Sequence, residues 1–364
     1  MRIKSLDVYR GLTITLMIIV NSYGNKSHTY SIISHAEWNG WTIADLIAPC
    51  LLFIMGISMS YSFKDGKKEG NKKKLYKKII RRSYILFLIG IITYNFPFYN
   101  LSSIRIMGVL QRISIVYLLT SITILNLRKK HIYLTILSIL LGYYFIVLIM
   151  LVTSNGVDIF SPENSMITVL DRAILGQSHL WNGNLYDPEG LAASIPATVL
   201  TFTGYLAGKW TQENRTSTQT AIIIMIVGVN LIGIAGIWSL SLPINKTLWT
   251  SSYSLLTIGF GLIFWGVLYL LIEVEQLQIL EGFKRIGLNA IIIFPGSEIL
   301  ERLTLIIPIQ ADETQTNLKQ WIYENIFNSW LGNSNASLLY GITHIIIWWG
   351  VCHLLYKKKI FLKV

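Results

Sequence analysis

The chain has 364 residues, of which 52% are hydrophobic and only 14% are charged, and its mean hydropathy is +0.52. This balance is typical of a polytopic membrane protein and excludes an ordinary soluble enzyme built on one large core. The net charge of +12 would suit a nucleic-acid-binding protein, but the basic residues gather in the connections between apolar segments. We therefore expect contact with membrane lipid and no nucleic-acid partner.

Ten apolar runs are long enough to cross a bilayer as helices, which satisfy their own backbone polar groups in lipid. They lie at residues 7–24, 41–62, 80–96, 106–126, 131–152, 191–208, 219–240, 247–273, 285–308 and 337–356. The sequence predicts an all-α, polytopic transmembrane helical bundle of about ten spans, forming a single domain over residues 1–364. We expect the ninth run to break at Pro295-Gly296.

The positions of Lys and Arg predict the orientation, because cytoplasmic connections are enriched in them. With the N-terminus inside, most of the 31 basic residues fall on the cytoplasmic side, and both termini are cytoplasmic. The loop at 64–82 is the most basic connection, and it is best explained as a topology signal that also touches anionic lipid head groups.

Three outward connections, at 24–41, 96–105 and 153–190, are polar enough to build a site. The last is unusually long, and long loops in compact domains are usually functional. Its middle predicts a short interfacial helix at Ser165–Leu175. We therefore expect the loop at 153–190 to contribute to a site on the outer side.

The stretch at 35–56 places His35 at the mouth of an apolar segment and Asp45 inside it. An Asp at the centre of an inserted helix costs roughly 2.5–3.5 kcal/mol, which favours a functional role for it. A lone loop histidine is usually inert, but Glu37, Trp38 and Asn39 crowd this one. The neighbouring tryptophans suit either an interfacial belt or stacking on a sugar ring, and both interpretations stay open.

Charged residues also occur inside two other predicted spans. Asp7 and Arg10 are three residues apart on the first helix and can pair, and Arg10 shares a helix face with Asn21. Arg112 falls about two turns inside the fourth span, where an unpaired guanidinium would be costly. We expect its partner to be an intramembrane carboxylate, and a structural and a functional ion pair are both open. The candidates are Asp45, Glu298 and Glu301.

The chain has no GxSxG elbow, P-loop, HExxH or Cys/His metal spacing, so serine hydrolysis, nucleotide hydrolysis and zinc catalysis are poorly supported. Several longer motifs instead recur in one group of proteins. They are Ser5-Leu-Asp7-Val-Tyr-Arg10-Gly, Val20-Asn21, His35-Ala-Glu-Trp38-Asn39-Gly40-Trp-Thr42-Ile-Ala-Asp45-Leu, Gly108-Val-Leu-Gln111-Arg112, Tyr186-Asp187-Pro188-Glu189-Gly190, Leu248-Trp249-Thr250-Ser-Ser-Tyr253 and Lys358-Lys359-Ile-Phe361. In these motifs the chain resembles the transmembrane N-acetyltransferases, namely the lysosomal heparan-α-glucosaminide N-acetyltransferase and its bacterial NagX-type relatives.

The resemblance implies acetyl-CoA as a cytosolic co-substrate, an amino sugar or glycan as the acceptor on the outer side, and no metal. It maps the family's catalytic histidine onto His35 and its helpful asparagine onto Asn21. A histidine suits general-base work on the amine, and Asn21 or a backbone amide could donate to the thioester oxygen. An acetylated His35 intermediate and direct transfer in a ternary complex are both open. Asp45 or Glu37 would orient the imidazole.

The remaining candidates divide by the side of the membrane. The expected substrate-binding residues are Glu37, Trp38, Asn39, Gln111, Arg112, Asp187 and Glu189, the two carboxylates of the long loop binding sugar hydroxyls or the ammonium. Basic residues at the inner mouth would attract the nucleotide phosphates. The expected cofactor-binding residues are Ser5, Asp7, Arg10, Lys284 and Arg285.

We therefore expect a multi-pass protein of a bacterial cytoplasmic (inner) membrane, with His35 facing the periplasmic or outer side. The predicted reaction moves acetyl from acetyl-CoA to the amine of glucosamine or a glucosamine-containing glycan. One alternative is O-acetylation of an exported polysaccharide. Another is secondary transport of a sugar or organic anion, which the broken ninth run and the intramembrane charges would also suit. A homodimer is an open alternative to a monomer.

Overall fold

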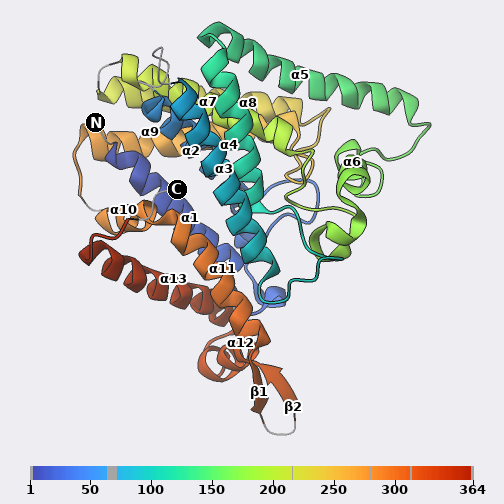
Figure 1. Cartoon of the computed structure of the whole chain (residues 1–364), viewed down its shortest axis with the longest axis vertical. Helices are drawn as coiled ribbons and strands as arrows, with labels where there is room; N and C mark the ends of the chain where they lie inside the picture. Colours follow the sequence, from blue (N-terminus) through green and yellow to red (C-terminus); the bar gives the residue numbers. More distant parts are fainter. Residues whose placement is uncertain (1–2, 64–71, 215, 279, 312–313, 362–364) are drawn as a thin grey trace. The chain divides into compact units, whose positions relative to one another are not determined.

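The computed structural model describes residues 3–63, 72–214, 216–278, 280–311 and 314–361. Part of the predicted basic loop, residues 64–71, lies outside the described residues, and its prediction as a loop up to residue 82 is wrong, because a helix begins at Lys72. The described chain is overwhelmingly helical (Figure 1). The main helices are α1 (Lys4–Asn21), α2 (Ile43–Ser62), α3 (Lys72–Asn95), α4 (Val109–Asn126), α5 (Lys129–Thr153), α6 (Met166–Leu175), α7 (Ser194–Glu213), α8 (Thr218–Trp238), α9 (Ser251–Tyr269), α10 (Glu281–Leu288), α11 (Ala290–Ile306), α12 (Leu318–Trp321) and α13 (Asn333–Lys357).

Each predicted apolar run coincides with one or more of these helices, which confirms the helical membrane architecture. Six helices of the described chain are long and apolar enough to cross a membrane. They are α2, α4, α5, α8, α13 and α9 together with the π-helical turn at Leu270–Val274. A count of ten spans stays a prediction.

The described residues fall into two compact units. The first contains residues 1–36, 42–47 and 277–364, and the second contains residues 37–41 and 48–276. The single-domain interpretation stays a prediction.

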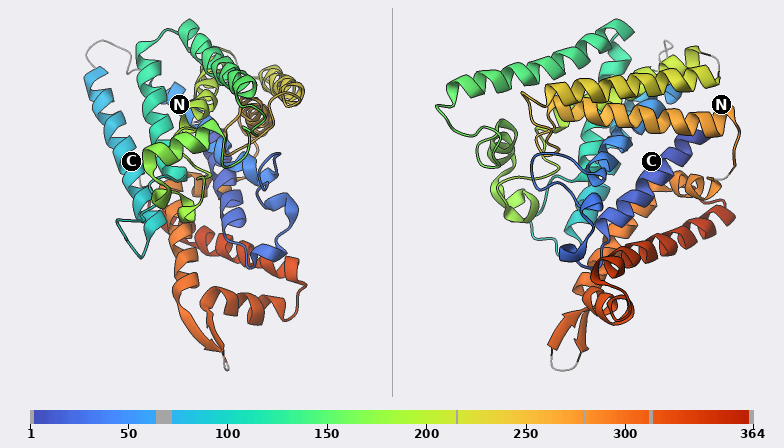
Figure 2. Two further views of the ribbon diagram at one scale, coloured as in Figure 1. Left: turned by 90° about the vertical axis from the view of Figure 1, so that its right-hand side faces the viewer. Right: turned by 180° about the vertical axis from the view of Figure 1, so that it is seen from behind.

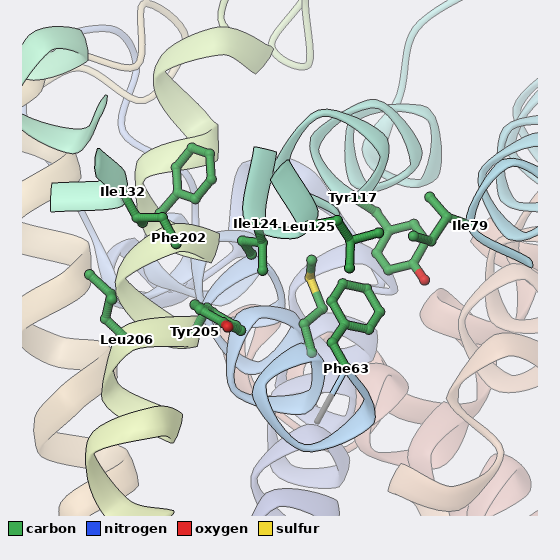
Figure 3. Close-up of a cluster of buried hydrophobic side chains, with 10 residues drawn as sticks. Phe63, Ile79, Tyr117, Ile124, Leu125, Ile132, Phe202, Tyr205 and Leu206 are labelled. Atoms are coloured by element: carbon green, nitrogen blue, oxygen red, sulfur yellow. The ribbon is translucent and has the colours of Figure 1, made fainter. Parts of the chain in front are cut away.

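The second unit is held together by apolar packing between its long helices. Figure 3 shows one cluster, to which α2, α3, α4, α5 and α7 all contribute buried side chains. Within this unit α2 and α7 approach to backbone contact, because a Cβ at Gly56 or Gly204 would overlap the main chain of the other helix. Helices α8 and α9 lie side by side in the same way across Gly228 and Gly259 (Figure 2). Small residues that let backbones approach are typical of helix packing in membranes.

In the first unit α1 packs on α10 through another pair of glycines. A Cβ at Gly11 would overlap the Phe283 carbonyl, and a Cβ at Gly287 would overlap the Asp7 carbonyl. The predicted break of the ninth run at Pro295-Gly296 is wrong. The chain breaks at Asn289, between α10 and α11, and Pro295 lies inside α11. A proline there removes one backbone donor, which a helix packed among others can tolerate.

Two connections between the long helices contain regular structure of their own. The short helix expected in the long loop at 153–190 is confirmed as α6, whose N-cap Ser165 accepts a hydrogen bond from the Thr168 N–H. The structure also contains a β-hairpin that the all-α prediction missed, formed by β1 (Pro308–Ala311) and β2 (Thr314–Asn317). In Figure 1 this hairpin follows α11 and leads directly into α12.

Candidate functional site

His35 and Asp45 form the central polar pair of the first unit. The imidazole Nδ1 lies 2.7 Å from Oδ1 of Asp45, whose side chain is 2% exposed while that of His35 is 47% exposed. A carboxylate only accepts hydrogen bonds, so Nδ1 carries the proton and donates it. The basic lone pair is then on Nε2, the nitrogen suited to accept a proton from a substrate.

The second oxygen of Asp45 organises the backbone around this pair. Its Oδ2 accepts hydrogen bonds from the Ala36 N–H and the Thr42 N–H, each at 3.1 Å, and from the Thr42 hydroxyl at 3.2 Å. Asp45 lies in the first turn of α2, where a negative charge also suits the helix dipole. One buried carboxylate therefore positions both the imidazole and the chain that carries it, and the structure pairs His35 with Asp45.

Asn21 ends α1 and contacts α11. Its Nδ2 donates to Oε1 of Glu298 at 2.6 Å. The connection that leads from Asn21 toward His35 is fastened to the start of α13, where the Gly24 N–H donates to the Ser337 carbonyl at 3.2 Å. The Asn25 N–H donates to the Ser337 hydroxyl at 3.1 Å. The segment that carries His35 is thus tied to helices at both of its ends.

The expected cofactor-binding residues gather where α1 crosses α10. Ser5 and Asp7 are buried, and Arg10 Nη1 lies 3.6 Å from the Asp7 carboxylate, as predicted, and 3.4 Å from the Gly287 carbonyl. The Lys284 ammonium pairs with Glu281 at 2.7 Å. A basic region therefore exists here, although the structure also gives these side chains internal partners.

Arg285 is held by two residues of α13. Its Nη1 lies 2.9 Å from Nδ1 of His353, and its guanidinium lies 5.0 Å from the centre of the Tyr356 ring. Since arginine can only donate, Nδ1 of His353 accepts, and that imidazole is neutral in this arrangement. The α13 helix thereby fixes the direction of the guanidinium.

In the second unit, Asp187 of the long loop binds Arg105 through two parallel hydrogen bonds. Arg105 Nε donates to Oδ2 at 2.9 Å and Nη2 donates to Oδ1 at 2.7 Å, and Oδ1 also accepts from the Glu189 N–H at 2.8 Å. Such forked pairs are strong and geometrically specific. Asp187 is buried, so these contacts hold the loop, and its expected role in binding sugar stays a prediction.

Arg112 pairs with Glu189, and the expectation of Asp45, Glu298 or Glu301 as its partner is wrong. Nη1 lies 2.8 Å from the Glu189 Oε2, and Nη2 donates to the Gly190 carbonyl at 3.2 Å. The guanidinium also lies 4.7 Å from the centre of the buried Trp249 ring. The partner comes from the connection between α6 and α7 rather than from a long helix, because Glu189 and Gly190 of this connection are buried.

Asp171 of α6 is a member of this cluster that the site prediction omitted. Its Oδ1 accepts from the Ala192 N–H at 2.8 Å, and its Oδ2 lies so close to Gly190 that a Cβ there would overlap it. Burial of the Asp171 carboxyl raises its pKa to about 6, the Ala192 N–H and the Arg112 guanidinium oppose this rise, and Asp187 adds to it. The cluster thus contains a carboxyl that titrates near neutrality.

The remaining candidates of the 35–45 motif belong to the second unit. Asn245 Nδ2 donates to the Trp38 carbonyl at 3.0 Å and to Oδ1 of Asn39 at 3.1 Å. The Trp38 indole donates to the Phe160 carbonyl at 2.6 Å and meets the Tyr186 ring edge-on at 4.9 Å. Glu37 is exposed. Trp38 therefore contacts both Asn245 and Tyr186, which are distant from it in sequence. The prediction missed Asn245. Its only signal in the sequence was a polar side chain shortly before the Leu248-Trp249-Thr250 motif.

Gln111 is fully buried, and within the described part of the chain neither its amide nitrogen nor its oxygen has a hydrogen-bond partner. Its side chain lies against Gly90 and Gly108, where a Cβ would crowd it. Direct contact with substrate therefore stays a prediction for Gln111. Among the described residues no group of three or more His, Cys, Asp or Glu side chains could hold a metal ion.

Comparisons with known proteins agree with the motifs. The sequence profile of the family described as "Heparan-alpha-glucosaminide N-acetyltransferase, catalytic" matches residues 2–244. A protein named heparan-alpha-glucosaminide N-acetyltransferase from Mus musculus is 28% identical over 422 residues, and one of that name from Homo sapiens is 28% identical over 421 residues. Each alignment covers 100% of this chain and 60% of the relative, so the chain spans well under two thirds of their length.

Proposed function

Since the chain belongs to the heparan-alpha-glucosaminide N-acetyltransferase family, we propose that it moves acetyl from cytosolic acetyl-CoA to the amine of glucosamine or a glucosamine-containing glycan on the outer side. The observation that carries this proposal is the contact between His35 and the buried Asp45 at 2.7 Å. It supplies an imidazole in the tautomer that general-base catalysis needs.

The acceptor amine must lose a proton to attack the thioester. In the proposed step its nitrogen bonds to the acetyl carbon, the carbon–sulfur bond breaks, and the amine proton passes to Nε2 of His35. Coenzyme A then leaves as its thiolate or thiol. Asp45 stabilises the positive charge that forms on the ring and keeps the ring oriented. One N–H of the Asn21 amide donates to Glu298, and the second N–H can donate to the thioester oxygen as negative charge develops on it.

The donor side of the proposal rests on charge. Acetyl-CoA is polyanionic and cannot cross a bilayer, so its phosphates would bind at the inner surface. The guanidinium groups of Arg10 and Arg285 and the ammonium of Lys284 are suited to attract them.

On the acceptor side, the segment at 37–41 offers Trp38 and Asn39, held by Asn245, as residues that bind the sugar. We also propose ten spans, which the ten apolar runs support, and cytoplasmic termini, which the distribution of basic residues supports. The support for a bacterial cytoplasmic membrane is the resemblance to the bacterial NagX-type relatives.

The test is an assay with purified protein in detergent. With labelled acetyl-CoA and glucosamine, we expect labelled N-acetylglucosamine and one free thiol per product. Acetylation of hydroxylated acceptors alone would replace the proposal with polysaccharide O-acetylation. Substrate uptake into proteoliposomes without any acetylated product would replace it with transport.

A further inference from the structure

A second polar cluster of the first unit lies around Glu301, on α11. The ammonium of Lys319 lies 2.5 Å from Oε1 of Glu301, and the two side chains are only 12% and 11% exposed. The same ammonium lies 4.9 Å from the centre of the Tyr23 ring and 5.8 Å from that of Tyr340. A carboxylate beside aromatic faces is a recognised way to bind an ammonium ion.

The members of this cluster come from four separate parts of the first unit. Glu301 and Tyr340 lie in long helices, α11 and α13, and Tyr23 directly follows α1. Lys319 lies in α12, which directly follows β2 in the chain and continues into a π-helix at Ile322–Asn328 (Figure 1). A lysine ammonium sits on a flexible four-carbon stem. The carboxylate and the rings are therefore carried by the long helices and the end of α1, whereas the competing ammonium is carried on a flexible stem.

His344 gives a second reason to expect a ligand. Its Nε2 lies 3.6 Å from Oε2 of Glu301, and its ring centre lies 4.9 Å from that of Tyr340, with the two rings tilted by 36°. The residue is only 4% exposed, yet its Nδ1 has no hydrogen-bond partner among the residues that the structure describes. A buried polar atom without a partner costs free energy. A ligand that carries hydroxyl groups next to its ammonium could supply the missing hydrogen bond.

We propose that Glu301, Tyr23, Tyr340 and His344 form a subsite for the primary ammonium group of an amino sugar, and that Lys319 occupies it until the sugar arrives. This inference rests on the proposed function, since it identifies where the protonated acceptor is first recognised. Deprotonation of the amine follows this recognition. Because Lys319 and the acceptor compete, removing the lysine charge strengthens acceptor binding.

The first test uses the wild-type protein in detergent without acetyl-CoA. A brief pulse of an amine-acetylating reagent labels lysines, and mass spectrometry measures the modification of Lys319 relative to Lys129, an exposed lysine paired with Glu213. We expect glucosamine to raise the relative labelling of Lys319 several-fold, and glucose and N-acetylglucosamine to leave it unchanged. Unchanged or lowered labelling with glucosamine would overturn the proposal.

The second test is kinetic. Lys319→Met should lower the KM for glucosamine several-fold and leave the KM for acetyl-CoA unchanged, whereas Lys129→Met should change neither. Glu301→Gln should raise the KM for glucosamine. An unchanged or raised KM for glucosamine in Lys319→Met refutes the subsite. If the wild type makes no N-acetylglucosamine, the proposed function fails, and the labelling experiment still decides whether the ammonium subsite exists.

Discussion

The Nδ1–H of His35 donates to Oδ1 of Asp45, while Oδ2 of the same carboxylate accepts from Ala36 and Thr42. In Asp45→Asn, the amide oxygen would face those N–H donors, and the NH₂ group would face the imidazole. Nδ1 would then have to accept, which moves the ring proton to Nε2 and removes the base. We expect kcat to fall by about 10²- to 10⁴-fold, as expected where a carboxylate sets the tautomer of a catalytic histidine.

The measurement is the steady-state rate of acetyl transfer, with folding checked by size-exclusion chromatography. The KM for acetyl-CoA should change little. A folded Asp45→Asn protein with a normal kcat would remove the tautomer argument.

The buried pair of Arg112 and Glu189 should behave as a unit. Arg112→Leu leaves the Glu189 carboxylate buried without its partner, which costs about 3–5 kcal/mol of the free energy of unfolding. The double variant Arg112→Leu/Glu189→Leu should recover much of this loss, because apolar replacements of a buried pair are often neutral. Thermal unfolding in detergent measures both.

The exposed pair of Lys129 and Glu213, with side chains 47% and 56% exposed, provides the control. Lys129→Met should cost at most about 1 kcal/mol. If Arg112→Leu were as mild as this control, the Arg112 guanidinium would have to be in contact with water.

The crossing of α1 and α10 predicts a difference between two glycines. Gly287→Ala places a methyl group against the Asp7 carbonyl and should lower folded yield, because overpacking costs roughly 1–3 kcal/mol. Gly142→Ala in α5 meets nothing within 4 Å and should leave yield unchanged. Equal yields of folded protein for both variants would contradict the backbone contact at this crossing.

The raised pKa of Asp171, about 6, predicts a pH dependence of stability. The folded protein binds this proton more tightly than the unfolded chain, so its contribution to stability grows as the pH falls from about 6 toward about 4. The contribution is lost as the pH rises through 6, and its full size is about 2–3 kcal/mol. The Asp171→Asn variant lacks this pH-dependent contribution to stability.

The measurement is the melting temperature of wild type and Asp171→Asn across this pH range. The wild type should gain stability relative to the variant on acidification. A difference between the two proteins that does not vary with pH would show that Asp171 does not titrate there.

The sequence predicted the helices and named Asp45 as one of two candidates, with Glu37, for the residue that orients His35. Apolar runs suffice to place helices, because the bilayer demands them, and Asp45 stood out as a carboxylate inside such a run. The hairpin at 308–317 was missed because a short polar segment behind a helix has no hydrophobic pattern. Hydropathy likewise gave no reason to place the break of the ninth run at Asn289.

The sequence also failed to predict side-chain partners that lie far apart in the chain. Arg112 was expected to pair within the spans, since hydropathy assigns residues 186–190 to water. In the structure Glu189 is only 7% exposed, because the long loop folds back onto the helices. The cluster of Lys319, Glu301 and His344 was missed for the same reason, since its members lie on three separate elements of the chain.

The most direct test of the account compares wild type with His35→Ala in the acetyl-CoA and glucosamine assay, with coenzyme A binding measured on the same samples. The account predicts that the variant binds coenzyme A as the wild type does and forms no N-acetylglucosamine. Normal product formation by a folded His35→Ala protein would contradict it.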